Sequence, residues 1–220
     1  MEDVNLLIQQ LQAIAQSGMH YGKDVFDRER YEQLERISKK LTAQLVDNPT
    51  RENLTLFFDS DVGYVTPKVD VRAATFKDDK ILLVEEKREQ VWSLPGGWAD
   101  IGFSPAEIAD KETFEEAGIN VDVKRLVGIK DMQKNPYHKH NLSYIYKLFF
   151  ECEPLEDDLH GGVETSNAKY FTKKEAMNLN LSVGRNIPED IEMLFAAHAD
   201  PNWNAYFDQV DTHYNGHGLG

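Results

Sequence analysis

The 220-residue chain has little cysteine, few basic residues for its size and no long apolar run. Its one cysteine, Cys152, cannot form an intramolecular disulfide, which fits a reducing compartment. Lys and Arg number 24 against 38 Asp and Glu, so a broad basic surface for double-stranded nucleic acid is not expected. The first residues, "MEDVNLLIQQLQ", lack the basic region and apolar core of a signal peptide, and no segment approaches bilayer length. We therefore expect a cytoplasmic protein without a membrane partner.

The N-terminal part of the chain has a helical period. Apolar residues recur at three- and four-residue steps in segments 4–15 and 31–45. A shorter apolar cluster at 54–58 is consistent with a third helix, and 62–68 has the composition of a linker. We predict a helical region over 1–64 that either packs on the following domain or pairs with its copy in a homodimer, because two helices alone bury their faces poorly.

Beyond the linker, the period becomes that of strands. The segments with strand character are 69–76, 80–87, 91–97, 119–133, 143–153 and 167–172. A tight turn is expected at 77–79, and a helix at 188–199 with Pro188 in its first turn. Strands mixed with helices predict an α+β or α/β sandwich over 66–200. The tail, 201–220, has no predicted role.

A helix rich in glutamate follows two glycines in "GGWADIGFSPAEIADKETFEEAGI" (96–119). Ser104 is a good N-cap, Pro105 suits the first helical position, and Glu107 completes a capping box. Gly118 is suited to end the helix. These signals predict a helix that begins at Pro105 and stops before Gly118.

Glu112, Glu115 and Glu116 fall within an arc of about 100° on this helix. Like charges at this spacing repel, and the C-terminal end of the helix dipole disfavours them further. A solvated acidic face would explain the glutamates but not the Gly-Gly pair before them. A hard divalent cation explains both features, because carboxylates and substrate phosphates together hold Mg²⁺. The Gly96 carbonyl is suited to join them.

The segment from Gly97 to Ile119 reads G-x5-F-x7-K-E-T-x-E-E-x-G-I. It resembles the Nudix box, G-x5-E-x7-R-E-U-x-E-E-x-G-U, where U is a bulky aliphatic residue. The sequence departs from this pattern at Phe103, Lys111 and Thr113. These departures affect the geometry and rate more than the presence of metal, which the resemblance assigns to E-x-x-E-E. Lysine keeps the charge of the family's arginine but lacks its planar fork.

Segments 16–34, 67–73, 92–100 and 164–171 resemble a Nudix subfamily with an N-terminal helical extension. Its members are described as CDP-choline pyrophosphatases or ADP-ribose pyrophosphatases. The resemblance implies an α/β/α sandwich with a mixed sheet, preceded by a small helical region. It also implies hydrolysis of a nucleoside diphosphate linked to another moiety, with Mg²⁺, or Mn²⁺ in its place, as cofactor. The expected substrate is CDP-choline, cleaved to CMP and phosphocholine; ADP-ribose or another nucleoside diphosphate sugar is the alternative.

The resemblance implies a set of metal ligands and catalytic residues. The expected metal ligands are Gly96, Glu112, Glu115, Glu116 and Glu164. The expected catalytic residues are Glu112, Glu115 and Glu164. Glu164 follows a Gly-Gly pair that would let its loop fold over the site, as ligand or general base; alternatively it is a surface glutamate before a strand.

Five further residues are candidate substrate contacts. Arg72 could reach a phosphate or form an ion pair at a strand end. Trp98, beside the glycines, could line a pocket. Tyr137, His138 and His140 belong to a predicted loop that could grip a base or a phosphocholine head, since aromatic faces attract quaternary ammonium. The alternative for that loop is a polar hairpin connection.

A function of another class is a Nudix fold that has lost catalysis and senses a nucleotide for a partner protein. Phe103 favours this hypothesis. The three retained glutamates and the lack of an effector domain, such as a basic helix-turn-helix, oppose it.

Overall fold

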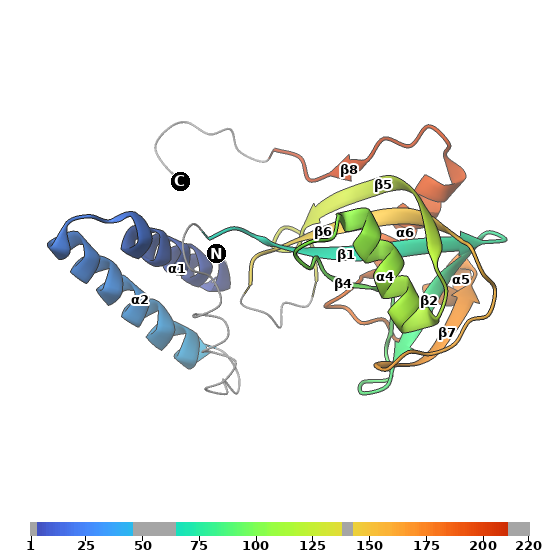
Figure 1. Cartoon of the computed structure of the whole chain (residues 1–220), viewed down its shortest axis with the longest axis horizontal. Helices are drawn as coiled ribbons and strands as arrows, with labels where there is room; N and C mark the ends of the chain where they lie inside the picture. Colours follow the sequence, from blue (N-terminus) through green and yellow to red (C-terminus); the bar gives the residue numbers. More distant parts are fainter. Residues whose placement is uncertain (1–3, 46–64, 138–142, 211–220) are drawn as a thin grey trace. The chain divides into compact units, whose positions relative to one another are not determined.

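The computed structural model divides the chain into two compact units (Figure 1). The residues that it describes are 4–45, 65–137 and 143–210. The first unit is built chiefly from Met1–Lys68, and the second from Val69–His138 and Ile145–Gly220. The expected helix at 54–58 lies outside the described residues, as does part of the expected linker. Within the described ranges, no helix is long and apolar enough to cross a membrane.

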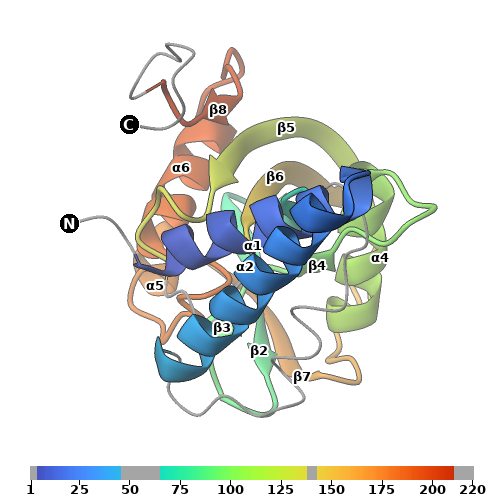
Figure 2. The same ribbon diagram turned by 90° about the vertical axis from the view of Figure 1, so that its left-hand side faces the viewer.

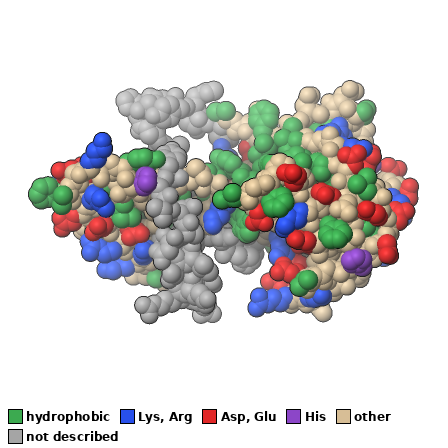
Figure 3. All heavy atoms as spheres, viewed as in Figure 1, with side chains coloured by type: hydrophobic (Ala, Val, Ile, Leu, Met, Phe, Trp, Pro, Cys, Tyr) green, Lys and Arg blue, Asp and Glu red, His purple; other side chains and the backbone are tan. Residues whose placement is uncertain are grey.

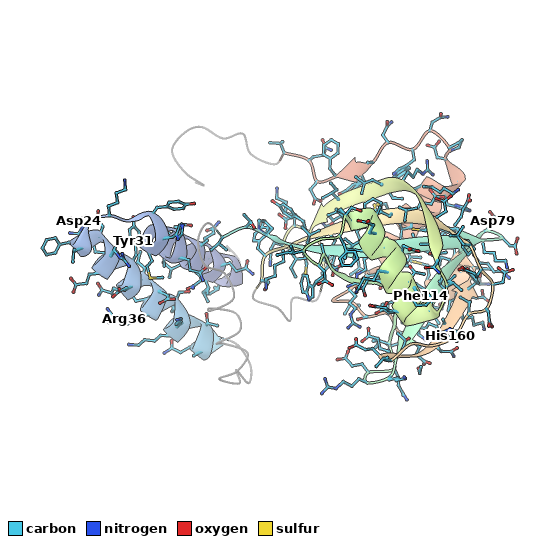
Figure 4. The ribbon with its side chains drawn as sticks, in the orientation of Figure 1. Asp24, Tyr31, Arg36, Asp79, Phe114 and His160 are labelled. Atoms are coloured by element: carbon cyan, nitrogen blue, oxygen red, sulfur yellow. The ribbon has the colours of Figure 1, made fainter. Side chains whose placement is uncertain are left out.

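In its described residues, the first unit is a pair of helices, α1 (Val4–Tyr21) and α2 (Val25–Leu45), as the helical period predicted. Asp24 caps α2, because its Oδ1 accepts hydrogen bonds from the backbone N–H groups of the second and third residues after it. The helices approach closely at Gly18, where an added Cβ would lie 2.2 Å from the ring of Tyr31. Figure 4 labels Asp24 and Tyr31 at this end of the pair.

The faces of this helix pair are mixed in character. Ile8 and Ala15 are buried, but so are the polar side chains of Gln12, Ser38 and Thr42. Several members of the predicted apolar stripes are instead exposed: Val4, Leu7, Ile14, Ile37 and Leu41. The two helices therefore bury only part of their apolar stripes against each other.

The second unit is an eight-stranded sheet with helices on both sides. Its strands are β1 (Lys68–Lys77), β2 (Lys80–Glu86), β3 (Trp92–Ser93), β4 (Gly96–Trp98), β5 (Val121–Asp131), β6 (Ile145–Pro154), β7 (Thr165–Phe171) and β8 (Tyr206–Phe207). The strand order is β3-β2-β1-β6-β5-β8, with β4 also on β1 and β7 also on β2. β5 pairs with β6 antiparallel and with β8 parallel, so the sheet is mixed, as expected.

Three helices accompany the strands: α4 (Pro105–Ala117), α5 (Lys173–Ala176) and α6 (Pro188–Ala199). Figure 2 shows α4 and α6 on opposite sides of the strands, which confirms the predicted α/β/α sandwich. On the α4 side, Ile108 and Ala109 pack against Val71 and Cys152. On the α6 side, Ile191 and its neighbours join the larger apolar cluster. This packing fixes α4, and with it the glutamates, against the sheet.

The structure differs from the sequence prediction in two places. The segment predicted as one strand over 91–97 forms two short strands, because the chain crosses from β2 to β1 at Pro95, which has no N–H to donate. The tail contributes β8, and the Trp203 indole donates to the Val127 carbonyl at 2.9 Å. The first part of the tail thus packs on β5.

Candidate active site

The glutamate helix α4 has the ends that its sequence predicted. Ser104 Oγ accepts from the Glu107 N–H at 3.3 Å, and Glu107 Oε2 accepts from the Ser104 N–H at 2.7 Å. Gly118 ends the helix with φ +79° and donates to the Phe114 carbonyl at 3.0 Å. The capping box and the left-handed glycine are both confirmed.

Two carboxylates of α4 lie against the two glycines of β4. The Gly96 N–H donates to Glu116 Oε2 at 3.0 Å. A Cβ added to Gly97 would lie 3.0 Å from Glu112 Oε2, so this carboxylate lies close to the backbone of β4. Gly96 itself has φ +150°, and a Cβ there would lie 2.0 Å from a β1 carbonyl. The Gly-Gly pair and the glutamates thus form one structural unit.

The carboxyl groups that meet these glycines are partly shielded from water. Burial raises the pKa of Glu116 to about 7, and the charges of Glu112 and Glu164 oppose ionisation further. Burial also raises the pKa of Glu112, to which the charge of Glu115 adds. Arg72 lowers the pKa of Glu116 and Lys111 that of Glu112, but burial outweighs both, so a bound cation would favour the ionised carboxylates further.

Lys111 provides part of the missing positive charge. Its Nζ lies 3.0 Å from Glu115 Oε2 and 3.3 Å from Glu112 Oε1. The hydrogen bond to Glu115 is the main cause of the raised pKa of Lys111. In this arrangement Glu115, whose side chain is 54% exposed, is turned toward the lysine.

The loop after β6 folds over the C-terminal end of α4, as its glycines suggested. Thr165 Oγ1 donates to the Glu116 carbonyl at 2.6 Å and accepts from the Gly162 N–H at 2.7 Å. His160 lies against the end of the helix (Figure 4). Glu164 is exposed in this loop, and its carbonyl accepts from the Lys87 N–H at 3.0 Å. The contacts bring Glu164 into the electrostatic neighbourhood of Glu116.

The donor set fits a divalent cation. Buried carboxylates beside backbone carbonyls are the oxygen ligands that Mg²⁺ and Mn²⁺ accept. Across the described ranges, no three acidic, histidine or cysteine side chains are already gathered at ligating distances. Joint ligation by Glu112, Glu115 and Glu116 therefore requires Glu115 to leave Lys111. The Gly96 carbonyl stays a predicted ligand.

The candidate substrate contacts lie in different surroundings. Arg72 is 3% exposed, and its guanidinium is paired with Asp70 at 2.6 and 2.8 Å, which is the ion-pair alternative. Trp98 is 45% exposed at the end of β4. Tyr137 lies in the interior, not on an open loop: it is 4% exposed, and its hydroxyl donates to Asp190 at 2.7 Å. The other two candidates, His138 and His140, lie outside the described residues.

A buried charge network beside the site was not predicted. Lys147 is 1% exposed and donates to Asp70 Oδ2 at 3.0 Å and to the Arg185 carbonyl at 2.9 Å. Burial opposes the charge on Arg72, yet its pKa is raised, because Asp70 and then Glu116 favour the charged guanidinium. The signal in the sequence was a charged residue at the inward positions of otherwise apolar strands, in "VDVRA" and "YIYKLFF".

Comparison of the sequence with known protein families shows to which family the chain belongs. Residues 66–190, more than half of the chain, match the family described as "NUDIX domain". Residues 2–57 match the family described as "UDP-X-like, N-terminal oligomerisation domain". The chain belongs to the Nudix family and is a hydrolase of phosphoanhydride bonds, a pyrophosphatase. Nudix hydrolases generally use divalent metal ions, which agrees with the donor set on α4.

Similar proteins extend over both parts of the chain. A Bacillus subtilis protein named "Putative ADP-ribose pyrophosphatase YjhB" is 39% identical over 91% of this chain and 94% of its own length. A crystal structure named as a UDP-X diphosphatase is 31% identical, covers 92% of this chain and 97% of that one, and has a TM-score of 0.60. A crystal structure named as an ADP-ribose pyrophosphatase, from Streptococcus suis, is 36% identical and has a TM-score of 0.58. It covers 65% of this chain and 100% of its own.

Proposed function

We propose that the protein hydrolyses the pyrophosphate bond of ADP-ribose or a closely similar nucleoside diphosphate derivative, with Mg²⁺ as the metal ion. The observation that carries this proposal is the pair of partly buried carboxylates, Glu112 and Glu116, held against the glycines of β4. Relatives named as ADP-ribose pyrophosphatases support the substrate class. The retained glutamates support catalysis over a sensor role.

The residues of the site have different proposed roles in this reaction. Bound Mg²⁺ would neutralise phosphate oxygens and lower the pKa of the attacking water. Glu112, Glu115 and Glu116 would hold the ion, and the Gly96 N–H keeps the Glu116 carboxylate in place. Glu164, carried by the loop that clasps the end of α4, is the proposed acceptor of the water proton. Phosphoryl transfer depends mainly on positioning and charge stabilisation, which suits such a site.

CDP-choline is the second candidate substrate. The resemblance of the sequence to a Nudix subfamily implied it, and an aromatic loop was a candidate contact for its quaternary ammonium. In the structure Tyr137 is buried with its hydroxyl on Asp190, so this ring presents no open face to a choline group. The exposed ring of Trp98 is the remaining described aromatic candidate beside the glycines. We therefore place ADP-ribose before CDP-choline.

We propose that the protein is a homodimer that pairs through its first unit. The matched family is described as an oligomerisation domain, and the exposed apolar residues of α1 and α2 are suited to contact a second copy. The free, buried thiol of Cys152 is consistent with a reducing, cytoplasmic location.

A substrate panel tests the proposed function directly. The purified protein would be incubated with ADP-ribose, CDP-choline and UDP-glucose, with Mg²⁺, with Mn²⁺ and with a chelator. We expect metal-dependent release of AMP from ADP-ribose, abolished by the chelator and restored by added Mg²⁺. Turnover of CDP-choline in preference to ADP-ribose would reverse the order of the substrates. No turnover of any of the three would contradict the proposed function.

A further inference from the structure

Arg185 lies in a turn whose backbone is rigidly held. Its N–H donates to the Ser182 carbonyl at 2.7 Å, and its own carbonyl accepts from Lys147 Nζ at 2.9 Å. The next residue, Asn186, is fully buried, and its Oδ1 accepts from the Leu94 N–H at 3.1 Å. A side chain that projects from such a turn has a defined position.

Leu94 connects this turn to Arg72, the buried arginine of the site. The Leu94 N–H is bound by Asn186, and the Leu94 carbonyl accepts from Arg72 Nη1 at 3.2 Å. The pKa of Arg185 is lowered, first by burial and second by the charge of Arg72. The two guanidinium groups therefore lie close to each other. Arg72 is 3% exposed, whereas the Arg185 side chain is 41% exposed. Of these two cations, Arg185 is the one that a solute can reach.

The carboxylate partner of Arg185 borders the glutamate cluster. Arg185 forms an ion pair with Glu86, the last residue of β2. Glu86 is opposite Thr165 in the β2–β7 pairing, and these strands lie side by side in Figure 1. The Thr165 hydroxyl donates to the Glu116 carbonyl at 2.6 Å. Two separate connections, through Leu94 and through Glu86, thus place Arg185 beside the site.

The balance of charges in the glutamate site indicates which ligand Arg185 could bind. A diphosphate brings negative charge to a site that already holds Glu112, Glu115, Glu116 and Glu164. The glutamates can reach it only through metal ions, and Arg72 is already occupied by Asp70. An arginine presents five N–H donors in a planar fork that matches phosphate oxygens. With one carboxylate partner and a partly exposed side chain, Arg185 has donors to offer.

We propose that Arg185 is a substrate-binding residue of this site, whose guanidinium donates to oxygens of the substrate diphosphate. This inference rests on the proposed function, because it assigns a contact within the same site. Glu86 holds the side chain in position before substrate arrives. The residue determines affinity for the diphosphate more than the rate of bond cleavage.

The test compares Arg185→Gln and Arg185→Lys with the wild type. The matched control is Arg88→Gln, which removes the same charge from an exposed residue in the turn after β2. With ADP-ribose and saturating Mg²⁺, Arg185→Gln should raise KM about tenfold or more with a smaller change in kcat, and Arg185→Lys should recover part of the loss. Arg88→Gln should resemble the wild type. An unchanged KM in Arg185→Gln overturns the inference while leaving the proposed hydrolysis intact.

A binding measurement keeps the inference separate from catalysis. Titration calorimetry with α,β-methylene-ADP and Mg²⁺ uses a diphosphate whose bridge cannot be hydrolysed. We expect a Kd about tenfold or more weaker in Arg185→Gln, with an unchanged Tm showing that the fold is retained. If Arg185→Gln does not fold, the Kd of Arg185→Lys is compared with that of the wild type instead, and Arg185→Lys should still bind more weakly. Equal Kd values for the wild type and the folded variant, or binding by neither, overturn the inference.

Discussion

At the scale of single residues, the site is defined by charges that the fold has removed from water. Glu116 is held by the Gly96 N–H, and burial raises its pKa to about 7. Asp70 lies between Arg72 and Lys147, both nearly fully buried. Unlike surface ion pairs, such groups are costly to leave without a partner, so substitutions at these residues give clear tests.

The proposed metal ligands make the first prediction. Changing Glu112 or Glu116 to Gln removes a negative oxygen ligand while preserving size, so kcat should fall at least tenfold. Activity should become more dependent on the Mg²⁺ concentration. The measurement is the initial rate with ADP-ribose across a Mg²⁺ titration, with Glu89→Gln, at an exposed position, as control. Wild-type rates at limiting Mg²⁺ would remove that glutamate from the set of ligands.

The buried ion cluster makes the second prediction. Asp70→Asn leaves the buried cations of Arg72 and Lys147 without their carboxylate, and should lower the free energy of unfolding by about 3–5 kcal/mol at pH 7. Urea unfolding measures this loss. A change below about 1 kcal/mol would show that the cluster contributes little net stability.

The same carboxylate predicts a pH dependence. Burial alone would raise the pKa of Asp70, but Arg72 and Lys147 outweigh burial and lower it. Because the pKa of Asp70 is lower in the folded protein than in the unfolded chain, its ionised carboxylate stabilises the fold above the pKa of an unfolded aspartate, roughly pH 4. This stabilisation is lost as the pH falls through the pKa that Asp70 has in the folded protein. The stability difference between wild type and Asp70→Asn should therefore shrink below pH 4. A difference that stays constant on acidification would contradict this assignment.

At the scale of elements, the proposed position of Glu164 depends on the contact between α4 and the loop after β6. The Thr165 hydroxyl donates to the Glu116 carbonyl in the last turn of the helix and accepts from the Gly162 N–H, and the loop held in this way places Glu164 near Glu116. Both elements have strong local signals, in the capping box of α4 and the Gly-Gly pair of the loop. Their contact is a property of neither element alone.

Gly162→Ala tests this contact. An added Cβ would lie 1.8 Å from the Glu115 carbonyl, which is backbone and cannot turn aside. The loop must therefore move away from α4, and a displacement of about 1 Å at a catalytic group can cost roughly a hundredfold in rate. We expect kcat to fall by at least tenfold. Val163→Ala, at a residue that is 90% exposed, is the control and should leave kcat unchanged; equal effects of the two variants would contradict the proposed role of the contact.

At the scale of the whole molecule, the chain combines a catalytic unit with a helix pair that leaves apolar surface open. On the face seen in Figure 3, acidic and basic side chains are interspersed with apolar ones over the second unit. The first unit exposes Leu7, Ile14 and Ile37. An exposed apolar stripe of this kind marks an interaction surface more often than a solvated one.

Oligomeric state is the prediction at this scale. We expect light scattering to give a dimer for the intact chain. Ile14→Glu, which places a charge on a residue that is 56% exposed, should shift the protein to monomer without unfolding α1. Lys23→Glu, in the turn between α1 and α2, is the control and should remain dimeric. A stable monomer at micromolar concentration for the unchanged chain would contradict the proposed homodimer.

The sequence by itself determined most of the elements, including both ends of the glutamate helix. Capping residues, glycines and apolar period act over a few neighbouring residues, so the limits of α4 and α6 were predicted correctly. The turn at 77–79 was predicted for the same reason: Asp78 and Asp79 have the positive φ values that tight turns require.

Only the tertiary structure decided which side chains share an environment. Lys147 pairs with Asp70 across 77 residues, and Tyr137 reaches Asp190 across 53. Such pairs depend on strand register and on how α6 packs against the sheet, neither of which any local pattern encodes. The burial of Tyr137 and the closeness of Arg185 to Arg72 were therefore beyond the sequence, because each is set by residues that come together only when the sheet has formed.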